Sequence, residues 1–203
     1  MAYSVRVVEE TGSFGFGLTE IKNHLRYPYD DQDDNIQLIY LPTARKRVEE
    51  LTNRQLVTAS MELSLDRFPC GTDPILIPRA PLQSVESIVY VDSAGEEQTL
   101  DAERYVVDAN HEPGRVFPAY GTSWPSTRER TSGGTVKVTF TAGYTNGYPA
   151  ELFQAMLLLV GHYFYHREAV TMGATPKEVP RAVEDLCEAF SYGDEFCDYG
   201  GGA

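Results

Sequence analysis

The sequence predicts an α+β protein, a helical bundle with a β-rich antiparallel insertion between the second and third main helices. Apolar residues recur at helical spacing in residues 19–27, 34–52, 149–167 and, after a linker, in a last short helix over 181–190. Residues 56–141 instead alternate apolar and polar positions with a period of two. Because the strands lie together between helices, an alternating parallel α/β unit is excluded. We expect an N-terminal arm (1–18), a helical core (19–55 and 146–190), the insertion (56–145) and a flexible C-terminal tail (191–203).

The composition narrows the possible functions. The chain has 203 residues, which is long enough for a substantial hydrophobic core. Its 17 basic and 30 acidic residues give a formal net charge of -13, so a basic DNA-binding face or adhesion to an anionic membrane is not expected. The three cysteines are too few and too scattered for a disulfide framework or a CxxC zinc site, and the start lacks signal-peptide features. A reducing cytoplasm fits best.

The longest apolar stretch, residues 149–167, predicts a core helix. Pro149 suits the first helical position, and Glu151 places negative charge near the positive end of the helix dipole. The stretch is shorter than a membrane span and contains Gln154 and His162. Its apolar residues form two adjacent lines, which predict burial on two sides: Leu152, Met156, Leu159 and Tyr163, and then Phe153, Leu157, Val160 and Phe164.

Two further helices are expected before the insertion. Thr19 is the predicted N-cap of the first, over residues 19–27. The second runs from about residue 34 to 52, and Pro42 inside it should remove one backbone hydrogen bond and kink the helix. Its predicted apolar face comprises Ile36, Ile39, Tyr40, Ala44, Val48 and Leu51. The same helix carries the compact basic cluster Arg45, Lys46 and Arg47, which is either a solvated face or a contact for an acidic neighbour.

Acidic residues between these helices imitate part of a calcium-binding loop. Asp31, Asp33 and Asn35 match the first three ligand positions, but Ile36 stands where glycine is needed and Pro42 where the final glutamate is needed. We therefore expect these acids to cap and charge the start of the next helix rather than to bind a metal.

The insertion predicts an antiparallel meander. Residues 61–65 and 136–140 alternate apolar and polar side chains, which is typical of strands with one wet face, and shorter strands are expected near residues 75–77, 87–91, 105–107 and 115–117. Residues 118–134 are polar and rich in helix and strand breakers around Trp124. We expect a long exposed loop there, and loops of that length are often functional.

The sequence predicts no catalytic, metal or cofactor site. It contains neither a GxSxG nor an HExxH motif, and His162 and His166, four residues apart, lack an obvious third ligand or general base. The C-terminal end carries the regularly spaced aromatic residues Phe190, Tyr192, Phe196 and Tyr199. This end is either a frayed tail or a segment that becomes ordered on a partner.

The order of the segments is more informative than any single motif. The series begins with the short helical segment LTEIKNHLR and an acidic break. The segments that follow are, in order, ARKRVEELTNRQL, ELSLDRFP, ILIPRAPLQSVESIVYVDSAGEEQTL, YVVD, GRVFPAYGTSWP, VKVTFTAGY and PAELFQAMLLLVGHYFYHREAV. This series, over about residues 18–190, resembles the head-tail connector, or adaptor, proteins of tailed bacteriophages and related gene-transfer particles. The glycine-rich arm before Leu18 and the proline at position 42 depart from the family pattern.

The resemblance implies a non-enzymatic ring, usually of twelve copies, beneath the portal at the virion neck. The ring would join the DNA-filled capsid to the tail and continue the DNA channel, with double-stranded DNA passing through without specific binding. It would assemble in the bacterial host cytoplasm, without membrane or cofactor. The C-terminal tail (Phe190, Tyr192, Phe196 and Tyr199) would dock into the portal protein, and other surfaces would receive a stopper or tail-completion protein.

Ring contacts are expected at the basic cluster and along one apolar line of the core helix, namely at Phe153, Leu157 and Phe164. Two alternatives to the connector remain open. One is a β-rich tail or baseplate module that binds a receptor or glycan through the Trp124 loop. The other is a hydrolase whose catalytic carboxylates are distant in sequence.

Overall fold

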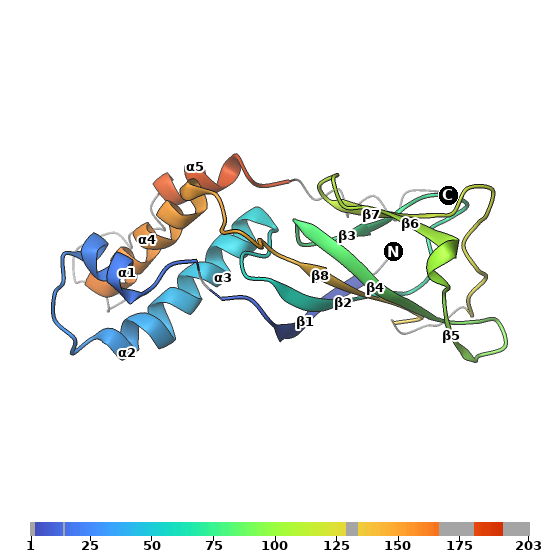
Figure 1. Cartoon of the computed structure of the whole chain (residues 1–203), viewed down its shortest axis with the longest axis horizontal. Coiled ribbons are helices and arrows are strands. Elements are labelled where there is room, and N and C mark those ends of the chain that lie inside the picture. The colour runs from blue at the N-terminus through green and yellow to red at the C-terminus, as the bar shows by residue number, and fades with distance from the viewer. Residues whose placement is uncertain (1–2, 14, 129–133, 167–180, 193–203) are drawn as a thin grey trace, which may run out of the picture. The chain divides into compact units, whose positions relative to one another are not determined.

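The computed structural model describes residues 3–13, 15–128, 134–166 and 181–192, which fall into two compact units (Figure 1). The β unit comprises residues 3–13, 57–128, 134–145 and Tyr192, and the helical unit comprises residues 15–56, 146–166 and 181–191. All the paired strands are antiparallel in the described chain. The predicted α+β class is therefore confirmed.

The β unit contains two sheets. The five-stranded sheet has the order β1 (Tyr3–Glu10), β2 (Ala59–Leu65), β8 (Val136–Ala142), β4 (Leu82–Val91) and β5 (Glu97–Thr99). The three-stranded sheet has the order β3 (Ile75–Ile77), β7 (Gly114–Pro118) and β6 (Tyr105–Asp108), with the short 3-10 helix η2 (Ala102–Arg104) before β6. The predicted meander is wrong, because β8 comes last in sequence yet lies between β2 and β4 (Figure 1).

The core of the β unit follows the alternation in the sequence. Residues Met61, Leu63 and Leu65 of β2 and their counterparts on β8 are buried, while the residues between them face outward. Leu63 pairs with Val138, so buried side chains of neighbouring strands lie on the same face of the sheet. The other sheet contributes buried Ile75, Ile77 and Val116 to the same hydrophobic cluster.

The helical unit is arranged around α4 (Ala150–Tyr165). This helix contacts α1 (Leu18–Leu25), the π-helical turn η1 (Ile36–Tyr40), α3 (Leu41–Thr52) and α5 (Arg181–Glu188). A short helix, α2 (Asp33–Asn35), precedes η1. Most residues on both apolar lines of α4 are buried, and Phe153 and Tyr163 are half-buried. Among the described residues, no helix has both the length and the apolar character needed to cross a membrane.

Pro42 is accommodated by a wider helical turn. The Leu41 N–H donates to the Ile36 carbonyl, five residues back, and α3 continues directly from there with Pro42 in its first turn. A proline ring clashes with the carbonyl four residues before it in a regular α-helix, and a π turn changes that spacing. The predicted kink therefore takes the form of a π-helical turn within one helical run, residues 33–52.

The π turn also changes which side chains are buried. Ile36 and Leu41 are buried five residues apart, and Ala44 and Val48 then follow at α-helical spacing. Ile39, predicted on the apolar face, is 54% exposed, whereas Tyr40 and Leu51 are half-buried. The extra residue rotates the buried line by about 100°, since an α-helix advances one turn in 3.6 residues.

Both predicted helix starts are shifted by one or two positions. Gly17, not Thr19, is the N-cap of α1, and its backbone N–H donates to the Glu20 carboxylate at 3.0 Å. Pro149 has an extended backbone and is the N-cap of α4 rather than its first helical residue. The proline still suits the position, because a helix start has backbone N–H groups without intrahelical partners.

Candidate functional site

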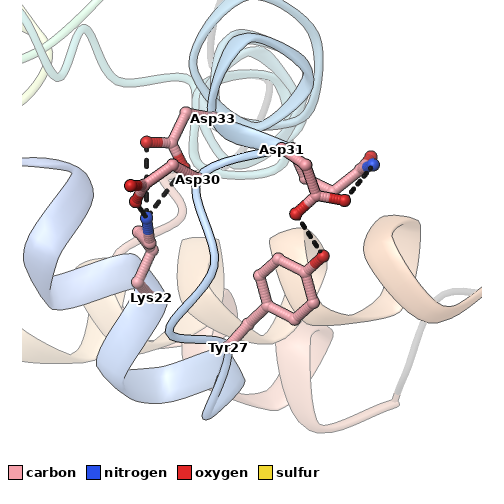
Figure 2. Close-up of polar contacts among 6 residues, drawn as sticks. Lys22, Tyr27, Asp30, Asp31 and Asp33 are labelled. Atoms are coloured by element: carbon pink, nitrogen blue, oxygen red, sulfur yellow. Dashed lines mark hydrogen bonds and ion pairs between the residues drawn. The ribbon is translucent and has the colours of Figure 1, made fainter.

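In the turn between α1 and α2, one lysine forms ion pairs with two aspartates. Lys22, near the end of α1, lies with its Nζ 2.5 Å from Asp30 Oδ1 and 2.9 Å from Asp33 Oδ1 (Figure 2). Hydrogen bonds to Asp30 and Asp33 raise the pKa of Lys22. The ammonium is therefore positively charged at neutral pH and closes the acidic turn onto α1.

Tyr27 makes a second contact within this turn. Its hydroxyl donates to Asp31 Oδ1 at 2.6 Å (Figure 2). The Tyr27 ring packs edge-on against Phe164 of α4, with 5.0 Å between ring centroids, and against Tyr29 at 5.3 Å. The turn is thus held both by charge and by aromatic packing on the central helix of its unit.

This geometry explains why the calcium-like spacing does not make a calcium site. A shallow hollow of about 640 Å³ beside the turn is lined by Lys22, Arg26, Tyr27 and Asp33, among others. Each of the three matching residues already has a partner: Asp33 pairs with the Lys22 ammonium, Asp31 accepts from the Tyr27 hydroxyl, and the Asn35 amide donates to Gln32 Oε1. Asp33 and Asp34 lie in the first turn of α2, so the acids charge its start as predicted. The predicted capping is wrong, because Gln32 is the N-cap and no side chain makes a cap hydrogen bond there.

Two of the three residues of the basic cluster on α3 form ion pairs with glutamates of the same helix. Arg45 Nε lies 3.8 Å from Glu49 Oε1, and Arg47 Nη1 lies 4.0 Å from Glu50 Oε2. Lys46 is exposed, and no ionic partner for it occurs in the described part of the chain. Of the three predicted contact residues, Lys46 is thus the one most open to another molecule.

The three interface candidates on α4 differ in exposure. Leu157 and Phe164 are each only 7% exposed, because they pack inside the helical unit. This burial argues against the prediction that they contact a neighbouring copy. Phe153 is half-buried, and its ring lies 4.4 Å from that of Phe16 in the N-terminal approach to α1. It retains some surface for a neighbour.

The beginning of the predicted C-terminal tail is bonded to the chain. Within the helical unit, Arg54 Nε donates to the Phe190 carbonyl at 2.8 Å, and the guanidinium carbon lies 5.9 Å from the centroid of the Phe190 ring. Within the β unit, the Tyr192 hydroxyl accepts hydrogen bonds from the backbone N–H groups of Arg79 at 2.9 Å and Ala80 at 3.2 Å. Phe196 and Tyr199 lie outside the described residues.

Trp124 is not the tip of an exposed loop. It is 9% exposed, its ring stacks on Phe68 with centroids 5.0 Å apart and planes 4° apart, and its Nε1 donates to the Asp73 carbonyl at 2.8 Å. The surrounding loop nevertheless exposes Tyr120 completely. The prediction of Trp124 as an exposed contact is wrong, because the indole is part of the hydrophobic core of the β unit.

The described residues give no support to a metal centre. His162 and His166 stack with ring centroids 4.9 Å apart, and His166 Nδ1 lies 3.2 Å from the His162 carbonyl. Within the described ranges, no group of three or more histidine, cysteine or acidic side chains could hold a metal ion. The pair lies at the C-terminal end of α4, where His166 is the C-cap.

Sequence reasoning missed the exposed apolar pair on η1. Leu38 is 73% exposed and Ile39 is 54% exposed, side by side on η1. The signal that could have revealed them is the five-residue gap between Ile36 and Leu41, immediately before Pro42. A regular helical face drawn through Ile36 and Ile39 cannot include Leu41 without an extra residue in the turn.

Of the comparisons with known proteins, only the one with solved structures gave matches. No protein-family model and no curated protein matches the chain. Among solved structures, it is similar to a chain in the neck of an empty GTA particle computed with C6 symmetry, with a TM-score of 0.70 and 26% identity over 94% of this chain and 95% of that chain.

Two further structures match at the same coverage, 94% of this chain and 95% of each of the others. A chain in the virion of a native gene transfer agent (GTA) particle has a TM-score of 0.68 and 26% identity. A chain in the neck of a native GTA particle computed with C12 symmetry has a TM-score of 0.66 and 25% identity. The similarity therefore covers nearly the whole fold, in both units.

Proposed function

We propose that the chain is a structural, non-enzymatic component of the neck of a phage-like particle, and that it acts there as a head-tail connector. The observation that carries this proposal is the match over 94% of the chain, at a TM-score of 0.70, to a chain in a GTA neck. In this role the chain forms a ring, of twelve copies as in the connector family, beneath the portal protein. The ring joins the capsid to the tail and receives a stopper or tail-completion protein on its other side.

Two properties of the chain support this role. A net charge of -13 disfavours adhesion to DNA, which suits a channel through which double-stranded DNA must slide without specific binding. The division of the chain into a helical unit and a β unit also suits it, because the two units offer different surfaces to neighbouring neck proteins. Assembly would occur in the cytoplasm of the bacterial host, and the mature location would be the virion neck.

The C-terminal tail is the proposed portal-docking segment, with Phe196 and Tyr199 as its contacts. Phe190 and Tyr192 have a different role, because both are bonded to the rest of the chain. They would fix the position from which the tail departs. The clean test removes residues 193–203 and leaves Tyr192 in place. Loss of portal attachment with an unchanged thermal melting curve is expected, and unchanged attachment would refute the docking role.

Deletion of the gene from its phage or prophage tests the function as a whole. Electron microscopy of the resulting particles should reveal DNA-filled or empty capsids without tails, alongside free tails, and a plasmid copy of the gene should restore the joined particles. Complete tailed particles that fail only to attach to cells would contradict the proposal and favour a receptor-binding module. The burial of Trp124 weakens that alternative, since the residue expected to contact the receptor lies in the core.

A further inference from the structure

The exposed pair Leu38 and Ile39 lies on a solvent-facing stripe of one helical run. The stripe begins with exposed Asp34, continues through the pair and through exposed Thr43, whose hydroxyl donates to the Ile39 carbonyl at 2.7 Å, and reaches exposed Lys46. It is therefore acidic at one end, apolar next to the acidic end, and basic at the other. Large apolar side chains held in water beside opposite charges are typical of a protein contact surface.

The charged ends of the stripe cannot satisfy one another within a chain. Asp34 and Lys46 are twelve positions apart on the same helical run, about 18 Å at the usual rise per residue. No ion pair of either residue occurs among the described residues, although their neighbours Asp33 and Arg47 have partners. Unpaired surface charges alone would mean little. Here they flank the exposed apolar pair, so both ends of the stripe can contact a further molecule at once.

We infer that the surface formed by Asp34, Leu38 and Ile39 binds the Lys46 and Arg47 segment of a second copy of this chain. The methylene stem of Lys46 from one copy covers the apolar pair of the next, and its ammonium pairs with the Asp34 carboxylate four residues before Leu38. The inference rests on the proposed ring, in which each head-to-tail contact joins one end of the stripe of one copy to the other end of the stripe of the next.

Charge complementarity favours a second copy of this chain as the binding partner of the stripe. The chain is strongly acidic, and residues 45–47 form its compact basic cluster, so an acidic-rimmed apolar surface on one copy has a matching basic segment on the next. Arg45 pairs with Glu49 and lies mostly buried, which leaves Lys46 and Arg47 as the accessible part of the cluster. One contact of this kind contributes little binding free energy, but the contact is repeated at every junction of a ring.

Charge reversal in trans tests the contact. A particle-producing strain that lacks its own gene is complemented with Lys46→Glu, with Asp34→Lys, or with both variants co-expressed as separate chains. Each single variant should lower the number of tailed particles at least tenfold, since like charges meet at every junction. Co-expression should restore the number to within threefold of wild type, because alternating copies then place opposite charges at every junction.

Two controls make the result specific. Glu103→Lys, an exposed position in the β unit with the same charge change, should not rescue Lys46→Glu on co-expression. Leu38→Ser combined with Ile39→Ser should also lower the number of tailed particles, and neither charge variant should rescue it. Thermal melts of the purified variants should match wild type, because all these side chains are exposed in the described chain.

The outcomes separate this inference from the proposed function. If the strain without the gene still makes tailed particles, the connector role fails and the contact fails with it. If that strain loses its tails but both single variants support wild-type numbers, only the contact is refuted. Single variants that are defective and are not improved by co-expression would also refute it, since the defect then arises within each copy.

Discussion

Replacing Trp124 should destabilise the β unit rather than remove a surface contact. The indole is 9% exposed, stacks on Phe68 and donates a hydrogen bond to the Asp73 carbonyl. Truncation of a buried aromatic side chain to alanine costs about 3–5 kcal/mol, and domains have only about 5–15 kcal/mol of stability in all. Trp124→Ala should therefore leave the β unit marginally folded at 25 °C.

A conservative variant separates packing from hydrogen bonding. Trp124→Phe keeps a stacked ring but leaves the Asp73 carbonyl without the indole donor, so a loss of about 1–3 kcal/mol is expected. The free energy of unfolding of the full chain is measured by urea denaturation with far-UV circular dichroism. In the wild-type chain, fluorescence of this single tryptophan reports on the β unit alone.

Tyr120 supplies the matched control, since it lies in the same loop and its side chain is fully exposed. Tyr120→Ala should change the free energy of unfolding by no more than about 0.5 kcal/mol. If Trp124→Ala also stayed within 1 kcal/mol of wild type, the packing described for the indole would be wrong. The loop would then be an exposed contact after all.

Three further predictions concern single side chains. Tyr192→Phe removes the acceptor of two backbone N–H groups and should cost about 1–3 kcal/mol in urea denaturation, and a cost near zero would argue against that anchor. Hydrogen bonds from the backbone N–H of Glu96 and from neighbouring donors lower the pKa of Asp92. The stability that Asp92 contributes is thus present above its unfolded pKa of about 3.9 and is lost as the pH falls through the lower folded pKa. Asp92→Ala should therefore be less stable than wild type at pH 7 and approach it below pH 3, and a constant difference across this range would contradict the reasoning. Burial raises the pKa of Cys187 to about 11, so at pH 8 a thiol reagent should modify exposed Cys70 in the native chain and Cys187 only after unfolding, as mapped by mass spectrometry.

The parts of the fold that sequence could predict are those governed by local spacing. Alternation at Met61, Leu63 and Leu65 was sufficient to identify a half-buried strand, and the two apolar lines of residues 149–167 identified the central helix. Both patterns reflect which face of one element is buried, and a single segment contains that information.

Features that depend on distant partners could not be predicted in this way. The order β2, β8, β4 depends on pairing between segments about 50 to 80 positions apart. Trp124 lies in a segment whose composition is typical of an exposed loop, and its burial depends on Phe68 and Asp73, more than 50 positions earlier. The composition of a segment indicates its local conformational preference, but not which distant residues it contacts in the folded chain.

The π turn before Pro42 also constrains how this helix can change in evolution. It amounts to a one-residue insertion, and deletion of one residue between Ile36 and Leu41 would restore four-residue spacing and a regular α-helix. The proline ring would then clash with the carbonyl four residues before it, so the deletion is tolerated only if Pro42 is replaced at the same time. The inserted residue and the proline should therefore be gained or lost together, and a relative with neither would lack the wider turn that carries Leu38 and Ile39.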